Sequence, residues 1–145
     1  MKRTMLFFLL SIVLLLAVTS CGPREYKPYA IEGFCDSAQA GEYVVVTGVL
    51  KIPETILEFE KSYGVMLVED LNQAEPYVRI GIPIGNGKNE MQTLPDGFTL
   101  ADIKIQTNDG QFVTLGDTVS ISGFYGGACG AGNSEIDVML IEAKK

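Results

Sequence analysis

The chain has 145 residues, of which 11 are Lys or Arg and 18 are Asp or Glu, so its formal net charge is -7. This length allows a single domain, and the complete lack of His excludes every catalytic triad, general base or zinc site that needs one. The acidic balance argues against binding to the phosphate backbone of nucleic acids.

Residues 1–20 differ in composition from the rest of the chain. Lys2 and Arg3 form a short basic start, and an apolar run interrupted only by Ser11 follows over 5–18. This layout is typical of a secretory signal peptide. The apolar run is also shorter than the roughly 20 residues that a bilayer-spanning helix needs.

The sequence Val18-Thr19-Ser20-Cys21 resembles the lipobox of bacterial lipoproteins. The resemblance implies cleavage before Cys21, a diacylglyceryl group on its sulfur and often an acyl group on its new amine. Two or three acyl chains hold a protein on a membrane, whereas one gives only marginal binding. The chain would then be anchored on the extracytoplasmic side, either periplasmic or at the cell surface. The alternatives are an ordinary signal peptide with an incidental Cys, or a signal-anchor helix.

Removal of residues 1–20 removes Lys2 and Arg3, so the net charge falls from -7 to -9. We expect residues 21–41 to form a tether and lead-in, because Gly and Pro recur there. Within this segment, Tyr26 and Tyr29 rest either on the domain or on the membrane interface. Residues 42–145 are expected to form one domain.

Two cysteines remain in the expected mature chain, Cys35 and Cys129. Thiol pairs outside the cytoplasm usually oxidise, and a disulfide between these two would contribute up to ~4–5 kcal/mol in the chain-entropy model. Two free thiols, or pairing with another chain, are the alternatives. Because no Cys-x-x-Cys spacing is present, a thioredoxin-like redox role is not expected.

The pattern from residue 42 onward predicts strands separated by turns. Five main strands are expected, over 43–52, 63–69, 77–84, 117–124 and 136–142. Gly48 predicts a bulge or bend in the first strand, and Pro83 places the end of the third at an edge or beyond the pairing. In the last two strands the alternation points five residues inward: Val119, Ile121, Ile136, Val138 and Leu140.

The connections carry turn and capping signals. Residues 54–61 are expected to be a loop or one helical turn, and 86–97 a long polar loop. Residues 99–102 fit a capped helical turn, 103–113 a short hairpin, and 126–132 a Gly-rich loop.

The number and order of these elements resemble the OB-fold, a five-stranded Greek-key barrel. The resemblance is carried by Val-Val-Val-Thr-Gly-Val-Leu over 44–50 and by Gly-Asp-Thr-Val-Ser-Ile-Ser-Gly over 116–123, a run seen in many OB domains, including the tRNA-anticodon-binding-like group. It implies an all-β five-stranded barrel over about 42–143, with an extra hairpin between strands three and four. In such a barrel Cys35 precedes the start of strand one and Cys129 follows the end of strand four, so the two can meet.

The resemblance also implies where a ligand binds, since OB domains use the outer face of strands two and three and the flanking loops. These positions correspond to Met66, Val68 and Arg79, with the loops at 53–61 and 126–132. Phe124 and Tyr125 stand beside the second loop, where they either stack on a sugar or base or cover the barrel mouth and the disulfide.

No other motif points to catalysis, a cofactor or a metal. The segment 81–89 lacks the Gly and Ser/Thr positions of a phosphate loop, and the acidic residues lack the spacing of a calcium loop. We therefore predict a non-enzymatic, lipid-anchored binding module of the cell envelope, with a protein or envelope glycan as its ligand. A small envelope hydrolase and a purely structural envelope lipoprotein are the alternatives.

Overall fold

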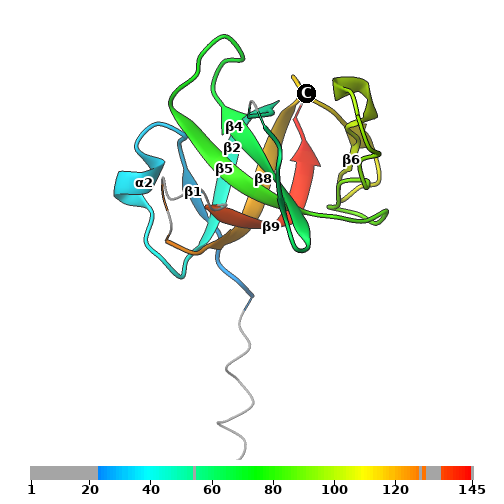
Figure 1. The fold of residues 1–145 in the computed structure, drawn as a ribbon. Coiled ribbons are helices and arrows are strands. Elements are labelled where there is room, and N and C mark those ends of the chain that lie inside the picture. The colour runs from blue at the N-terminus through cyan, green and yellow to red at the C-terminus, as the bar shows by residue number, and fades with distance from the viewer. Residues whose placement is uncertain (1–22, 54, 128, 130–134, 145) are drawn as a thin grey trace, which may run out of the picture.

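The computed structural model describes residues 23–53, 55–127, 129 and 135–144. The expected signal peptide and Cys21 lie outside this part of the chain. The elements are labelled as in Figure 1: β1 Lys27–Tyr29, α2 Phe34–Ser37, β2 Tyr43–Lys51, β3 Leu57–Phe59, β4 Ser62–Val68, β5 Tyr77–Pro83, the 3-10 turn η1 Leu100–Asp102, β6 Ile105–Gln106, β7 Phe112–Val113, β8 Thr118–Tyr125 and β9 Ile136–Ala143. Within the described ranges, no helix has both the length and the apolar character needed to cross a membrane.

Five strands close into a mixed β-barrel, which confirms the predicted all-β, OB-like architecture. Around the barrel the order is β2, β8, β9, β5 and β4, and β4 pairs again with β2. Only β5 and β9 run parallel to each other; the other four pairings are antiparallel. This is the strand order of an OB barrel.

Closure of the barrel depends on β2, which pairs with two neighbours in succession. Residues 43–49 pair with β8, and residues 49–51 pair with β4. Gly48 lies next to the change of partner. A Cβ atom on Gly48 would lie 2.6 Å from Cδ1 of Ile31 and 2.9 Å from the carbonyl oxygen of Val68. The strand can pass this close to its neighbours because residue 48 has no side chain.

The barrel interior is filled by apolar side chains from all five strands. The predicted alternation of β5 is present, since Val78, Ile80 and Ile82 have no exposed surface. Met91 is also fully buried, although it lies in the segment predicted as a polar loop. Its backbone bridges Ile84 and Ile105, so this loop contributes to the core.

The predicted inward position of Leu140 is wrong. A bulge in β9 pairs Ser122 with Leu140 but Gly123 with Val138, which leaves one extra residue, Met139, between them. Because a bulge shifts the alternation by one, Ile141 is fully buried instead and Leu140 is half-buried.

The connections contain short elements. β3 pairs with the start of β4, so the described part of the segment expected as a loop or helical turn is one arm of a hairpin. The predicted capped turn is present as η1, where the backbone N–H and hydroxyl of Thr99 donate to Asp102 at 2.7 and 2.9 Å. These two bonds hold the pKa of Asp102 below its ordinary value. The predicted hairpin is present as β6 and β7.

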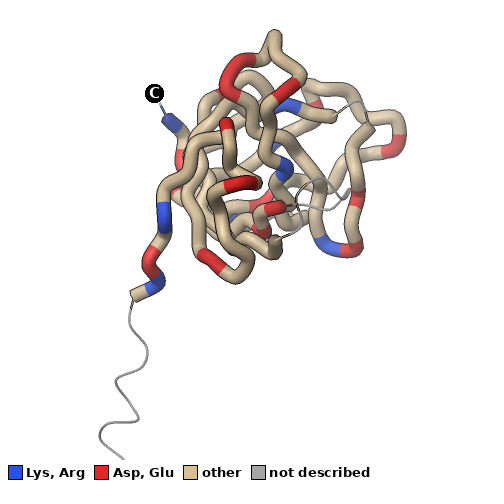
Figure 2. Tube along the Cα trace, turned by 90° about the vertical axis from the view of Figure 1, so that its left-hand side faces the viewer, with Lys and Arg blue, Asp and Glu red and all other residues tan. Residues whose placement is uncertain are grey.

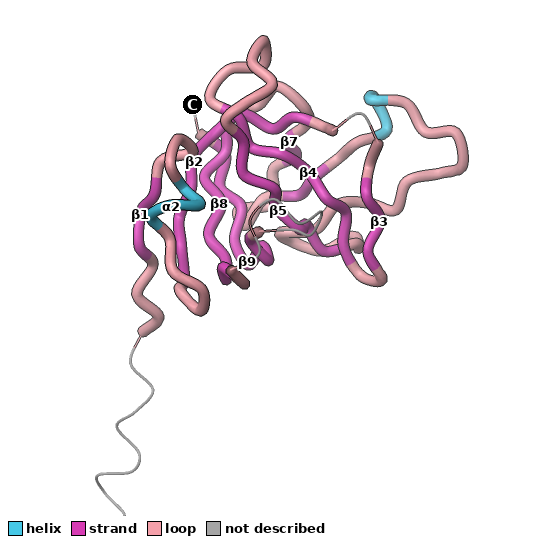
Figure 3. The backbone as a smooth tube through the Cα atoms, turned by 60° about the vertical axis from the view of Figure 1, so that its left-hand side comes forward, coloured by secondary structure: helices cyan, strands magenta, loops and turns pink. Residues whose placement is uncertain are grey.

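The segment expected as a tether and lead-in packs on the barrel, beginning with Arg24 and Tyr26, which contact the Tyr43 ring. β1 pairs in parallel with the start of β2, and α2 follows beside it (Figure 3). Ile31 and Phe34 are buried in the core. Cys35 of α2 forms the predicted disulfide with Cys129, with the two Cα atoms 5.8 Å apart. The bond ties the lead-in to the connection between β8 and β9.

The close approach at Gly48 predicts that Gly48→Ala destabilises the domain by about 1–3 kcal/mol, the usual cost of overpacking. The contact with the Val68 carbonyl is with backbone, which cannot rotate away. Gly126→Ala is the matched control, since a Cβ atom there meets nothing within 4 Å. Urea unfolding measures both variants, and equal midpoints would contradict the role assigned to Gly48.

Candidate functional site

Met66 and Arg79, two of the expected ligand-binding residues, lie together on the outer face as a cross-strand pair of β4 and β5. The guanidinium carbon of Arg79 lies 5.8 Å from the centre of the Tyr77 ring. Nε of Arg79 is buried and has no hydrogen-bond partner among the described residues. This pair is therefore a half-buried, cationic part of the barrel surface.

Val68 and Tyr125 do not present a surface to a ligand. Val68 is fully buried, and Tyr125 is 3% exposed. The Tyr125 ring packs edge-on against Phe34, with the centroids 5.0 Å apart, and its hydroxyl lies 3.2 Å from Sγ of Cys129. Tyr125 therefore covers the disulfide, which was the alternative interpretation of this residue. Phe124 points the other way and is 37% exposed.

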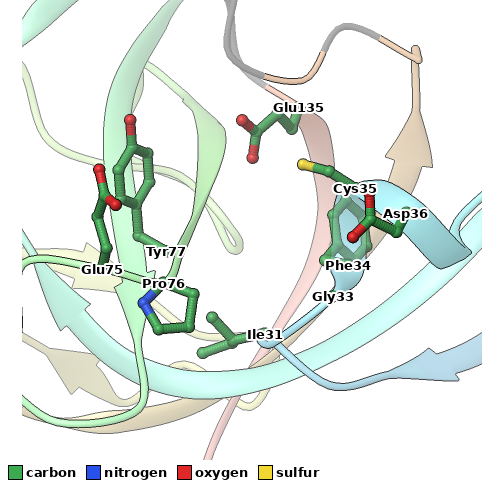
Figure 4. Close-up of a pocket in the computed structure, with 9 residues that line it drawn as sticks. All are labelled: Ile31, Gly33, Phe34, Cys35, Asp36, Glu75, Pro76, Tyr77 and Glu135. Carbon is green, nitrogen blue, oxygen red and sulfur yellow. The ribbon is translucent and has the colours of Figure 1, made fainter.

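A small pocket of about 260 Å³, lined by both acidic and apolar residues, opens between α2, the start of β5 and Glu135 (Figure 4). Asp36, Glu75 and Glu135 supply three carboxyl groups to its lining, and Tyr77 supplies a ring. Such a lining suits a ligand that is rich in hydrogen-bond donors.

Glu135 is the buried member of this pocket, with 3% of its surface exposed. Its Oε2 accepts a hydrogen bond from the backbone N–H of Arg79 at 2.8 Å. One Glu135 oxygen and the sulfurs of Cys35 and Cys129 lie within 4.8 Å of one another. Because the sulfurs are bonded to each other, they offer no thiolate to a metal ion.

A larger and more apolar groove, of about 420 Å³, lies at the far end of β2. It is lined by residues from four separate segments: Leu50, Lys51, Ile52, Pro53, Ile56, Leu71, Phe98, Leu100, Leu115 and Gly116. Three of them are large, apolar and exposed, namely Leu71 at 46%, Phe98 at 37% and Leu100 at 63%. Nζ of Lys51 donates to the carbonyl oxygens of Leu71 and Gln73 at 2.9 and 2.7 Å, which fixes this loop against β2.

The expected ligand surface included the loop at 53–61, which reaches one edge of this groove. It did not include Leu71, Phe98 or Leu100. One feature of the sequence could have indicated these residues as part of a binding surface. Large apolar residues occur in segments whose composition otherwise predicts turns, such as Phe98 directly after Asp96-Gly97.

Figure 2 colours the charged residues along the Cα trace, and several Lys and Arg segments adjoin Asp or Glu segments. A groove that follows a nucleic-acid backbone needs cations in a row. Along the described trace in Figure 2, Lys and Arg segments instead alternate with acidic and uncharged ones.

Glu42 holds β1 against the barrel, near the start of the described chain. The Glu42 side chain is 14% exposed. Its carboxylate accepts hydrogen bonds from Nζ of Lys27, from the Tyr29 hydroxyl at 2.6 Å and from the backbone N–H of Gln39 at 3.1 Å. These three donors, Lys27 foremost, lower the pKa of Glu42 to about 2. In return, the bonds to Glu42 raise the pKa values of Lys27 and Tyr29.

Comparisons of this chain with protein-family models, with curated proteins and with solved structures find no match. The fold is therefore established by its own strand order. Any function has to be argued from the geometry of the surfaces described above.

The Glu42 contacts predict a loss of stability in acid. A carboxyl whose pKa is lower in the folded state stabilises the fold above its unfolded pKa, and this contribution disappears as the pH falls through the folded pKa. The window therefore runs from about pH 4.5 down to about pH 2. Glu42→Gln should flatten the fall in unfolding temperature across this window, whereas Glu60→Gln, an exposed control, should not. Parallel acid profiles for wild type and Glu42→Gln would refute the contribution of Glu42.

Proposed function

We propose that this protein is a lipid-anchored, non-enzymatic binding module of the cell envelope, and that the apolar groove at the end of β2 receives a protein partner. The observation that supports the groove is the exposure of Leu71, Phe98 and Leu100 around one depression. Soluble proteins rarely leave several large apolar side chains together in water unless they bind something there. The volume is also in the range typical of ligand sites, roughly 300–1,000 Å³.

The position of the groove suits a protein held on a membrane by its N-terminus. β1 pairs in parallel with the start of β2, so the chain leading back to Cys21 leaves from that end. The groove involves Leu50 to Pro53, at and after the other end of β2. A nine-residue strand spans up to roughly 26 Å. The groove therefore faces away from the proposed anchor, where a partner can reach it.

The charge of the domain supports a partner other than nucleic acid. Without residues 1–20 the chain carries a net charge of -9, and phosphate backbones are repelled by such a surface. An envelope glycan is the second candidate. It is favoured by the three carboxyl groups of Asp36, Glu75 and Glu135 in the pocket beside α2, because carboxylates accept hydrogen bonds from sugar hydroxyls.

The anchor is tested by metabolic labelling with a palmitate analogue. We expect the wild type and a Ser20→Ala control, which keeps Cys21, to be labelled and to sediment with membranes. Cys21→Ser should lose the label, because no thiol remains to carry the diacylglyceryl group. Equal labelling of Cys21→Ser and wild type would contradict lipidation at this residue.

The groove is tested by placing a photo-crosslinking amino acid at Leu100 and irradiating intact envelopes. Phe112, which is 56% exposed but lies on β7 outside the groove, is the matched control. We expect a protein adduct from position 100 and none from position 112. A third position, Glu75, reports on the pocket beside α2. A glycan adduct from Glu75 with no protein adduct from Leu100 would favour the second candidate instead.

A further inference from the structure

We propose that a stripe of side chains on the barrel surface rests in the headgroup region of the membrane and fixes the orientation of the domain. The membrane stripe consists of Arg24, Tyr26, Tyr43, Phe124 and Met139. This inference rests on the proposed anchor at Cys21 and adds to it a second, non-covalent contact with lipid.

The stripe crosses four neighbouring strands. Tyr26 directly precedes β1, Tyr43 begins β2, Phe124 belongs to β8 and Met139 is the extra residue of the bulge in β9. The order of these strands in the sheet is β1, β2, β8 and β9. The side chains therefore come from positions far apart in the sequence and form one surface.

Ring contacts connect the members of the stripe. The Tyr43 ring packs edge-on against Tyr26 and against Phe124, with both centroid distances 5.7 Å. Arg24 lies over the Tyr43 ring, its guanidinium carbon 5.1 Å from the centroid, and Nη1 of Arg24 lies 3.9 Å from Sδ of Met139. Arg24 thus spans the stripe from β2 to β9.

Much of this apolar surface is left open to solvent. Phe124 is 37% exposed and Met139 is 38% exposed, although both could have been polar on the outer face of a sheet. Tyr and Arg combine an apolar body with a polar tip, which suits the boundary between headgroups and acyl chains. The composition of the stripe matches this boundary.

The length of the connecting chain brings the stripe to the membrane. Cys21 precedes Arg24 by three residues, and an extended chain covers at most about 3.6 Å per residue, so the two Cα atoms are at most about 11 Å apart. The headgroup region on each side of a bilayer is roughly 5–8 Å thick. A lipid on Cys21 therefore leaves no room for a long spacer between Arg24 and the headgroups. Figure 3 shows that the described chain starts beside β1 and the start of β2, at this end of the barrel.

Electrostatic attraction to lipid headgroups does not hold the membrane stripe on the bilayer. The net charge of -9 is repelled by anionic lipids. Lys27 is already paired with Glu42, and Glu25 follows Arg24 directly. We therefore expect the rings and Met139 to make the contact, and we expect it on uncharged, zwitterionic membranes.

The absence of Trp from the chain allows a direct measurement. The protein from residue 21 onward, which retains every described residue, is coupled to a maleimide lipid in phosphatidylcholine vesicles. Cys21 is then its only free thiol, because Cys35 and Cys129 are bonded to each other. Phe124→Trp is the reporter in the stripe. Phe98→Trp in the groove is the matched control, since both Phe residues are 37% exposed.

Brominated phosphatidylcholine should quench the Phe124→Trp emission about twofold or more, as expected for a ring within ~5–10 Å of the acyl boundary. The Phe98→Trp emission should stay unchanged, and Met139→Trp is a second reporter should Phe124→Trp not fold. Equal quenching of stripe and groove reporters, or none of either, would overturn the proposal. Since the coupling supplies the lipid chemically, this outcome is separate from failure of the palmitate labelling.

Discussion

The fold depends on a single strand that forms hydrogen-bonded pairs with two neighbouring strands in succession. β2 pairs first with β8 and then with β4, and the exchange takes place where Gly48 passes close to the Val68 carbonyl and to Ile31. Without that approach the sheet would stay open, with the edges of β2 and β4 unpaired. Ile31 comes from the segment before the barrel, so closure and docking of the lead-in occur at the same place. The disulfide and the Glu42 contacts then hold this segment from two further points.

The closed barrel separates its surfaces. One end carries the N-terminal segment, the disulfide and the stripe from Arg24 to Met139, while the other end of β2 carries the apolar groove. Exposed apolar residues at both ends are costly for a protein free in water. Under the two proposals, lipid covers the exposed apolar residues at one end of the barrel and a protein partner covers those at the other end.

The architecture was predictable because strand alternation, Gly48 and the run over 116–123 are local signals of a closed five-stranded barrel. The disulfide followed from the expected compartment and from the barrel topology together.

Leu140 was assigned to the wrong face because the position of a bulge depends on the partner strand. The only signal of the bulge in the sequence was Gly123. Met91, Leu71 and Phe98 were missed for a related reason. Their burial or exposure is set by residues distant in sequence, and periodicity within a loop carries no information about that. Val68 was correctly placed on a strand, whereas Tyr125 was placed beside the following loop and is the last residue of β8. The packing around both residues removes them from the surface.

The parallel pairing of β1 with β2 has a mechanical consequence. A pull between the groove and residue 21 acts along the strands, so the hydrogen bonds of β1 bear the load together, in shear, instead of opening one by one. If β1 detaches from β2, the load passes to Ile31 and Phe34 in the core. After them it reaches Cys35, which is covalently bonded to Cys129 of the barrel. A domain built in this way tolerates tension on its tether, because only the residues before Cys35 can be drawn out before the disulfide transmits the load to the barrel.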